Sequence, residues 1–416
     1  MNQRIGAALR ADFHVRTQGS THRLLANRLP LLSCTSMMVV SRMAGLRAEA
    51  RGYGKDTMAG TNESAVMEAL RGVIDPELHK DIVTLGMAKN VQVNGDKVSL
   101  LVTLTTPACP LKETIEKDVR AALAKVPGVT SVDLKFDALV PEARRMQDKA
   151  PIPGVKNLIA VASGKGGVGK TTVAVNLAIA LKNMGALVGL LDADVYGPNV
   201  PVMLGSTEQP KMLDEKTIIP IQAYGVKMIS MGLLNPGDKP LVWRGPMLHS
   251  VMQQFLRSVR WGMLDYLIVD LPPGTGDVQL SLIQTVSVSG AVLVTTPSVV
   301  ALADVRKAVE MFRQVKVEIL GIVENMSYFA CPHCRGKIDV FGHGEGQQLA
   351  KMFEVPFLGE IEIEPKIRIG GDTGRPVTSE GEDVPGAKSL YAMARNVAAR
   401  ISVVNLSSTA PVVQIL

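Results

Sequence analysis

A glycine-rich segment with two lysines carries the strongest chemical signal in this sequence of 416 residues. It reads SGKGGVGKTT over residues 163–172. Glycines allow backbone N–H groups to converge on phosphate oxygens, and a helix that begins there adds the positive end of its dipole. In the spacing G-x4-G-K-T, Lys170 is expected to contact the β- and γ-phosphates of a nucleotide, and the Thr171 hydroxyl to bind Mg²⁺. We therefore predict an ATP site that consists of Gly164, Lys165, Gly166, Gly167, Val168, Gly169, Lys170, Thr171 and Thr172.

Three aspartates follow strand-like runs and could serve the same nucleotide. Asp192 and Asp194 stand at the end of LVGLLDAD, and Asp270 ends YLIVD. A carboxylate at the carboxyl end of a strand beside the phosphate loop can hold a Mg²⁺-bound water. We assign this role to Asp270, with Thr171 as the second magnesium ligand, and expect Asp192 to be structural.

Two cysteines in the segment Cys331-Pro-His-Cys334 are the only pair in the sequence with the spacing of metal ligands. Zinc and iron–sulfur clusters require about four ligands, so this pair is half of a site. Three interpretations are open. His333 and His343 could complete a zinc site, two chains could each give Cys331 and Cys334 to one shared cluster, or the pair could be redox-active.

The groups named so far must be positioned by a regular alternation of strands and helices from residue 157 on. Runs rich in β-branched residues predict strands at 158–163, 187–192, 266–270, 291–296 and 319–325. Helices are expected at 170–183, 246–260, 278–287 and 302–315. Alternation of this kind predicts a parallel sheet with right-handed crossovers, covered by helices on both faces.

A smaller unit is expected to precede this sheet. Residues 61–72 have the pattern of a capped helix, and Asn94-Gly95 between two β-rich runs predicts a hairpin. A helix at 110–125 and a strand at 129–136 complete the unit. The predicted fold class is therefore α/β, a P-loop parallel sheet flanked by helices and preceded by a small α+β domain. The expected divisions are a tail at 1–58, the small domain at 59–137, a linker at 138–156, the P-loop domain with its cysteine loop at 157–400 and a C-terminal tail at 401–416.

Charge and hydropathy exclude two classes of partner. The net charge of +6 comes from the first 48 residues, so 38 of the 45 basic and 38 of the 39 acidic residues remain in the rest. That balance gives no sign of a basic surface for nucleic acid. The sequence has no long apolar run, and its C-terminal segment ISVVNLSSTAPVVQIL lacks the basic residues of a membrane-surface helix. We expect neither nucleic acid nor a membrane as a partner.

The loop KGGVGKT resembles the deviant Walker A motif of the MinD/ParA/nitrogenase-iron-protein class of ATPases. In that class the extra lysine reaches across a dimer interface to the partner's nucleotide. The resemblance therefore implies a homodimer in which Lys165 is catalytic together with Lys170. It also places Asp194 in switch I, where it would orient or activate the attacking water. Asn325 matches an Asn that contacts adenine in the related ATPases.

Residues 61–375 resemble, more specifically, the Mrp/ApbC family of iron–sulfur cluster carrier ATPases. The motifs GKGGVGKTT, LLDADVYGPN, WRGPM, IVDLPPGTGD, ENMSYFACPHC and FGHGEG occur in the order of that family. The resemblance implies an ATPase that binds a [4Fe–4S] cluster between two chains at Cys331 and Cys334. It further implies transfer of the cluster to apo iron–sulfur proteins, with cluster assembly factors as other partners. The small domain is similar to one fused to bacterial members. There Cys109 would be a candidate transient ligand, and the alternative is a buried, small hydrophobic side chain.

Two other functions use a related fold. A positioning ATPase of the MinD/ParA type, with a structural zinc at the CxxC, is the main alternative, although the chain lacks the membrane- or DNA-binding features such a protein needs. A nitrogenase-like reductase would use the cluster for electron transfer, but its cysteines are spaced singly.

The location of the protein follows from the same resemblance. Because bacterial relatives carry the small domain, we expect a bacterial cytoplasmic protein whose translation could begin at Met37, Met38 or Met58. The alternative is the mitochondrial matrix, since the arginine-rich residues 1–48 fit a transit peptide.

Overall fold

The structure is a computed structural model, and it describes residues 62–143, 149, 151–194, 197–214, 216–234, 256–298, 301–334 and 336–407. The expected tail at 1–58 and the motif WRGPM at 243–247 lie outside the described residues. So does most of the helix expected at 246–260, of which the described residues 256–258 are helical.

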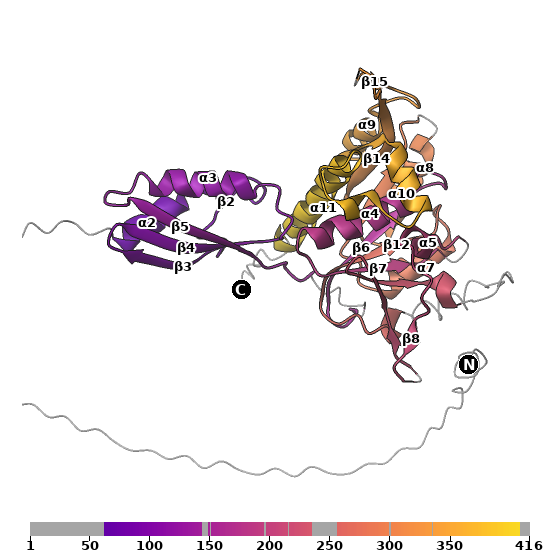
Figure 1. The fold of residues 1–416 in the computed structure, drawn as a ribbon, viewed down its shortest axis with the longest axis horizontal. Coiled ribbons are helices and arrows are strands. Elements are labelled where there is room, and N and C mark those ends of the chain that lie inside the picture. The colour runs from indigo at the N-terminus through magenta and orange to yellow at the C-terminus, as the bar shows by residue number, and fades with distance from the viewer. Residues whose placement is uncertain are drawn as a thin grey trace, which may run out of the picture. The chain divides into compact units, whose positions relative to one another are not determined.

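The small unit consists of a three-stranded sheet and two helices (Figure 1). Strand β4 pairs antiparallel with β3 across Asn94 and Gly95, and it pairs in parallel with β5. The predicted hairpin and both predicted helices are confirmed. Apolar side chains from the helices and the sheet form one core. The elements are α2 (Glu63–Arg71), β1 (Ile74–Asp75), β2 (Lys80–Asp81), β3 (Ala88–Asn94), β4 (Lys97–Leu104), α3 (Lys112–Leu123) and β5 (Ser131–Ala138).

The large unit is built on a nine-stranded sheet in the order β10-β11-β7-β12-β6-β13-β14-β15, with β16 also paired with β14. Its pairs are parallel except for β10 with β11 and β14 with β15. This confirms the predicted P-loop sheet of class α/β. The strands are β6 (Val155–Ala162), β7 (Val188–Asp192), β10 (Ile221–Ala223), β11 (Val226–Ser230), β12 (Leu264–Asp270), β13 (Gly290–Thr295), β14 (Ile319–Ala330), β15 (Lys337–Ile338) and β16 (Phe357–Ile363). A separate two-stranded ladder joins β8 (Lys211–Met212) and β9 (Ile218–Ile219).

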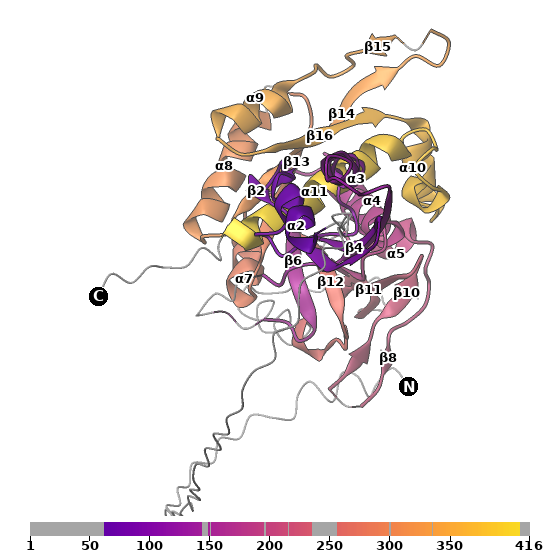
Figure 2. The same ribbon diagram turned by 90° about the vertical axis from the view of Figure 1, so that its left-hand side faces the viewer.

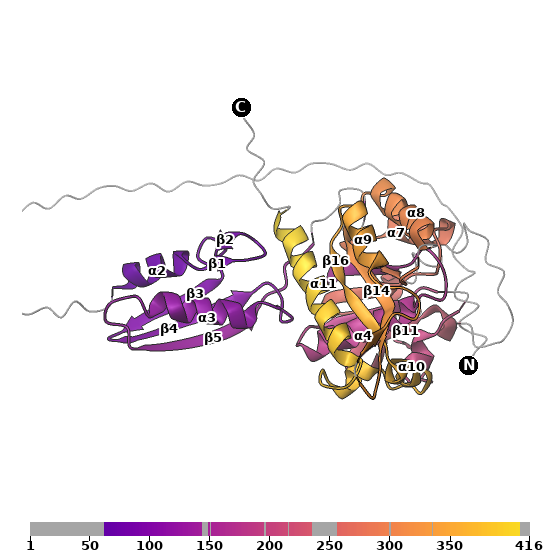
Figure 3. The same ribbon diagram turned by 90° about the horizontal axis from the view of Figure 1, so that it is seen from above.

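Helices cover both faces of this sheet, which explains why its strands read as continuous apolar runs. Side chains that alternate along β6 belong to different cores: Ile159 lies with α4 and α11, and Leu158 lies with α7, α8 and α9. Figure 3 shows α4 and α11 side by side, away from α7 and α8. The helices are α4 (Lys170–Asn183), α5 (Val200–Met203), α7 (Asp277–Thr285), α8 (Ala301–Gln314), α9 (Glu345–Met352), α10 (Pro365–Asp372) and α11 (Ala387–Ser407), with 3-10 turns at Met231–Leu234 and Val377–Glu380.

The carboxyl ends of three strands, β7, β12 and β14, hold or lead to predicted site residues. The carboxyl ends of β7 and β12 lie side by side, with Asp270 in register with Asp192. Strand β14 continues to Ala330, beyond the end expected at 325, because it turns back through the cysteine segment into β15. This β14–β15 hairpin projects from the sheet (Figure 2).

Candidate functional site

The predicted phosphate loop lies between β6 and α4, as a nucleotide site requires. Lys170 is the first residue of α4, and Gly167 and Gly169 both have φ of +79°, a conformation that favours glycine. At Gly164 the reason for glycine is space. A Cβ there would lie 2.4 Å from the backbone of Asp304 in α8. Local sequence and one tertiary contact therefore fix the path of the loop.

A pocket of about 380 Å³ opens over this loop, a size in the range of small-molecule sites. The loop residues 165–172 line it, together with Asp194 and Pro273. Part of the lining comes from α10, a helix that the sequence analysis did not connect with the site. Its contribution is Ile367, Arg368, Gly371 and Asp372. A signal for this helix existed, since Glu364 caps its first turn and Pro365 begins it.

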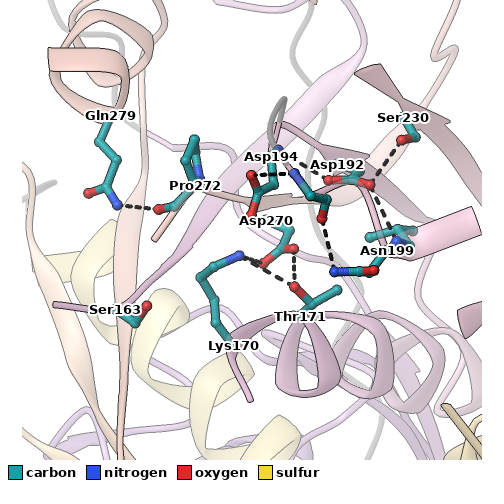
Figure 4. A network of polar contacts seen from close by, with 12 residues as sticks. Ser163, Lys170, Thr171, Asp192, Asp194, Asn199, Ser230, Asp270, Pro272 and Gln279 are labelled. Carbon is teal, nitrogen blue, oxygen red and sulfur yellow. Dashed lines mark hydrogen bonds and ion pairs between the residues drawn. The ribbon is translucent and has the colours of Figure 1, made fainter. Parts of the chain in front are cut away.

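A buried ion pair lies at the base of the pocket. Lys170 Nζ is 2.6 Å from Asp270 Oδ1, and Thr171 Oγ1 donates to Asp270 Oδ2 at 2.7 Å. Figure 4 shows Lys170 and Thr171 both bonded to Asp270. Burial raises the pKa of Asp270, while the lysine and the threonine hydroxyl act in the opposite direction. The two predicted magnesium ligands are thus adjacent oxygen atoms, the donor type that Mg²⁺ prefers, so the residues fit this ion.

The two aspartates after β7 have different surroundings. Asp192 is fully buried and accepts from Ser230 Oγ at 2.9 Å and from the backbone N–H groups of Asp194 and Val200. Burial, and then the charge of Asp270, raises the pKa of Asp192 to about 7. These bonds fix the start of the segment that follows β7, which agrees with the structural role expected of Asp192.

Asp194 is buried but lines the nucleotide pocket, and its carboxylate accepts from the N–H of Gly197 at 3.2 Å. Lys165 is half-buried and also lines the pocket. Both side chains therefore lie where a nucleotide would meet them. Their roles as the water-orienting residue and the trans-acting lysine stay predictions.

Asn325 lies beneath the phosphate loop and is not among the residues that line the pocket. Its Nδ2 donates to the backbone oxygen of Val168 at 2.9 Å. Only 6% of the residue is exposed. The adenine contact stays a prediction, whereas the bond to the loop is present in this structure.

The predicted metal ligands occupy the turn of the β14–β15 hairpin. Cys331 is half-buried and Cys334 is exposed. The N–H groups of Cys334 and His333 lower the pKa of the Cys331 thiol, because they stabilise the thiolate. A thiolate is the form that binds metal, so the turn favours a ligand at this position.

His343, a candidate fourth ligand in the zinc interpretation, belongs to another group of side chains. Its Nδ1 is 3.0 Å from Ser327 Oγ and 3.6 Å from a carboxylate oxygen of Glu360. Ligand atoms of Glu324, His343 and Glu360 lie within 4.8 Å of one another. Glu324 already accepts from Ser327 and from the backbone, and Glu360 is paired with Lys337 at 3.1 Å. His343 therefore belongs to a hydrogen-bonded group with Ser327, Glu324 and Glu360.

Cys109 of the small unit has different surroundings from the hairpin cysteines. It is half-buried, and burial raises the pKa of its thiol to about 11. At neutral pH the thiol form dominates, which favours the buried, unreactive role over that of a transient ligand.

Comparison with known proteins identifies the family. The family model described as NUBPL iron-transfer P-loop NTPase matches residues 154–398, more than half of the chain. The chain belongs to this family. A second family model, described as iron-sulfur cluster assembly protein, matches residues 63–134.

Two bacterial proteins and one archaeal structure are among the proteins similar to this chain. The iron-sulfur cluster carrier protein of Deinococcus radiodurans is 52% identical over 344 residues, which cover 82% of this chain and 97% of that protein. The protein of the same name from Synechocystis sp. is 48% identical over 347 residues, covering 82% and 98%. A solved structure, a nucleotide-binding protein from Archaeoglobus fulgidus in complex with ADP, is 39% identical with a TM-score of 0.48 and covers 53% of this chain and 88% of its own.

The matched residues 154–398 include every residue predicted for the nucleotide site and the cysteines of the hairpin turn, whereas Cys109 lies in the part matched by the second family model. Within the described part of the chain, none of the helices has the length and apolarity of a membrane span.

Proposed function

We propose that this chain is an iron–sulfur cluster carrier that binds and hydrolyses ATP. The observation that carries the proposal is one domain with both a complete nucleotide loop over a 380 Å³ pocket and a pair of cysteines, one half-buried and one exposed, in a hairpin turn. The relatives from Deinococcus radiodurans and Synechocystis sp., 52% and 48% identical, are named for cluster carriage, which supports the same function.

In the proposed function, ATP binding and hydrolysis depend on residues that line the pocket or lie beneath it. Lys170 leaves Asp270 to contact the β- and γ-phosphates, and Thr171 with Asp270 holds Mg²⁺. When bound, Mg²⁺ neutralises charge on the phosphate oxygens. Asp194 orients the attacking water at the pocket wall, and Lys165 reaches the nucleotide of a second chain.

The cluster half requires two chains. Each gives Cys331 and Cys334, so that four thiolates hold one [4Fe–4S] cluster as cargo. The cluster passes to apo iron–sulfur proteins, and assembly factors supply it. The exposure of Cys334 fits a cargo that must be handed over. ATP hydrolysis is coupled to loading or transfer of the cluster.

The remaining parts of the proposal concern organisation and location. We assign a small assembly-type domain to 59–137 and the P-loop domain to 157–400. The free thiols of Cys331 and Cys334 fit a reducing compartment, such as the bacterial cytoplasm or, if residues 1–48 are a transit peptide, the mitochondrial matrix.

Anaerobic reconstitution of the full chain with ferrous iron and sulfide tests this function. We expect a brown protein with about four iron ions per two chains. Cys331→Ser and Cys334→Ser should each abolish the colour and leave ATP binding intact, whereas Cys109→Ser should keep the cluster. One tightly bound, colourless zinc ion per chain with no uptake of iron would instead indicate a P-loop NTPase with a structural metal.

A further inference from the structure

Strand β14 leads directly from the nucleotide site to the cysteine turn. Its residues are buried from Ile319 to Asn325, and from Met326 on all but the buried Ser327 are partly exposed or, at Ala330, exposed. Ala330 is the residue before Cys331. In the sheet it pairs in parallel with both β13 and β16. A shift of this strand would therefore reach the cysteines without passing through another element.

Asn325 connects the strand to the phosphate loop. Besides its bond to the backbone oxygen of Val168, its amide packs so closely on Gly169 that a Cβ at that glycine would lie 2.2 Å from Nδ2. Val168 and Gly169 directly precede Lys170. If the loop moves when it binds phosphates, the side chain of Asn325 must therefore move with it.

Glu324, the preceding residue, points to the opposite face of the strand, as the alternation of strand side chains requires. It is fully buried, and its carboxylate accepts from Ser327 Oγ at 2.5 Å and from the N–H groups of Gly344 and Gly346 at 3.1 and 2.5 Å. Ser327 in turn lies 3.0 Å from His343. The segment FGHGEG and the start of α9 are thus tied to the strand that carries the cysteines.

An irregularity follows these two residues. Met326 has φ of +57°, a left-handed conformation that is rare for a residue with a side chain. The register with β16 shifts between Asn325 and Phe329. Strain of this kind persists only where the surroundings hold it. Here the surroundings are the two side-chain anchors, and the bend they hold lies between the nucleotide loop and the cysteine turn.

We propose that Glu324 and Asn325 are positioning residues that couple occupancy of the nucleotide loop to the placement of the cysteine turn. Asn325 senses the loop, and Glu324 holds the segment against which β14 bends. The inference rests on the proposed function, because it needs one protein that binds both ATP and a cluster.

The experiment measures one coupling factor, the ratio of the affinities for a non-hydrolysable ATP analogue with and without the reconstituted cluster. The full chain is used throughout. We expect a factor of about 5–150 in the wild type, the usual range for allosteric coupling, and by reciprocity the analogue changes cluster affinity equally. Asn325→Ala and Glu324→Gln should bring the factor within about twofold of unity while both ligands still bind.

Two further variants control for folding and for general loss of a hydrogen bond. In Glu324→Gln the amide N–H₂ faces a backbone N–H donor, which destabilises the folded chain. Ser327→Ala is a milder change to the same hydrogen-bonded group, and it should also lower the coupling factor. Asn396→Ala is the matched control, because it removes an amide bond to a strand carbonyl, that of Leu358, away from both sites. It should keep the wild-type factor.

Three results would overturn the assignment. A wild-type factor of one, or variants with the wild-type factor, would show that the residues do not couple the sites. If Asn325→Ala no longer prefers ATP over GTP but keeps the wild-type coupling factor, Asn325 contacts adenine and does not couple the sites. The double variant Cys331→Ser/Cys334→Ser lacks the thiolates of the turn. If it still binds zinc, and if adding Glu324→Gln abolishes that binding, Glu324 is a metal ligand. Failure of the wild type to bind any cluster would instead refute the proposed function itself, and this inference with it.

Discussion

Lys170 has a partner in this structure from which the proposed phosphate contact would draw it away. Its Nζ is paired with the fully buried carboxylate of Asp270, which also accepts from Thr171. The pair holds the lysine at the base of the pocket, and phosphate oxygens together with Mg²⁺ would replace each partner. Removal of the lysine should therefore have two separable effects, one on binding and one on stability.

We predict that Lys170→Ala weakens ATP binding at least about 10- to 100-fold, because each lost charge-assisted contact is worth about 1.5–3 kcal/mol. It should also destabilise the fold by about 3–5 kcal/mol, since Asp270 is left buried without its counter-ion. Titration calorimetry and chemical unfolding measure the two effects. The double variant Lys170→Ala/Asp270→Asn should recover most of the stability and none of the ATP affinity. Recovery of both would contradict the role of Lys170 as a phosphate ligand.

Asp192 should make stability depend on pH. Its pKa of about 7 in the folded chain is above the ordinary value of 3.8, so the folded state holds a proton that the unfolded state has lost. The contribution of Asp192 to the free energy of unfolding is fully present below about pH 4. It is lost as the pH rises through 7, at up to about 1.4 kcal/mol per pH unit. Unfolding at several pH values, without nucleotide, should show a flatter slope in Asp192→Asn. Equal slopes would mean that Asp192 stays ionised.

At the scale of elements, the phosphate loop is held in place by α8 as well as by its own glycines. The missing Cβ of Gly164 leaves room for the backbone of Asp304, 2.4 Å from where that atom would be. Gly166 has no such neighbour, since the nearest atom, a side-chain carbon of Pro273, lies 3.9 Å away. Space therefore requires glycine at position 164, whereas the space around position 166 would admit a Cβ.

We predict that Gly164→Ala destabilises the folded chain by about 1–3 kcal/mol, because the methyl group must displace α8 or the loop. Gly166→Ala should change stability by less than about 0.5 kcal/mol, as an unstrained surface substitution does. Thermal unfolding of the nucleotide-free variants measures the difference. Equal melting temperatures would show that the close approach of α8 to the loop is absent in solution.

The elements that the sequence predicted best are those encoded by local pattern. Runs of β-branched residues marked β6, β7, β12, β13 and the first part of β14, and Asn94-Gly95 marked the hairpin, because these signals depend on neighbours in the chain. The wall of the pocket formed by α10 and the bond from Asn325 to Val168 depend on residues far apart in sequence. No periodicity reports such contacts. The extension of β14 to Ala330 was missed because the irregular Met326 interrupts the pattern.

At the scale of the whole molecule, both proposed activities, cluster binding and ATP hydrolysis, require a second chain. The cysteine turn supplies two thiolates where a cluster needs about four, and the resemblance of the loop to the deviant Walker A motif implies that Lys165 acts on the nucleotide of a second chain. The two requirements are independent, since one depends on the hairpin and the other on the phosphate loop. The second can be tested without any iron.

Mixing of two inactive variants tests whether Lys165 acts in trans. Lys165→Ala and Lys170→Ala should each lack ATPase activity as homodimers. In a mixed dimer, the Lys165→Ala chain keeps its own Lys170 and receives Lys165 from its partner, so one of the two sites is complete. Random mixing at equal concentrations should therefore restore about a quarter of the wild-type rate, since half of the dimers are mixed and half of their sites work. Lys351→Ala, which removes an exposed lysine of α9, should keep full activity alone. If Lys165 acts on the nucleotide of its own chain, no mixture of the two variants regains activity, because every site then lacks one lysine.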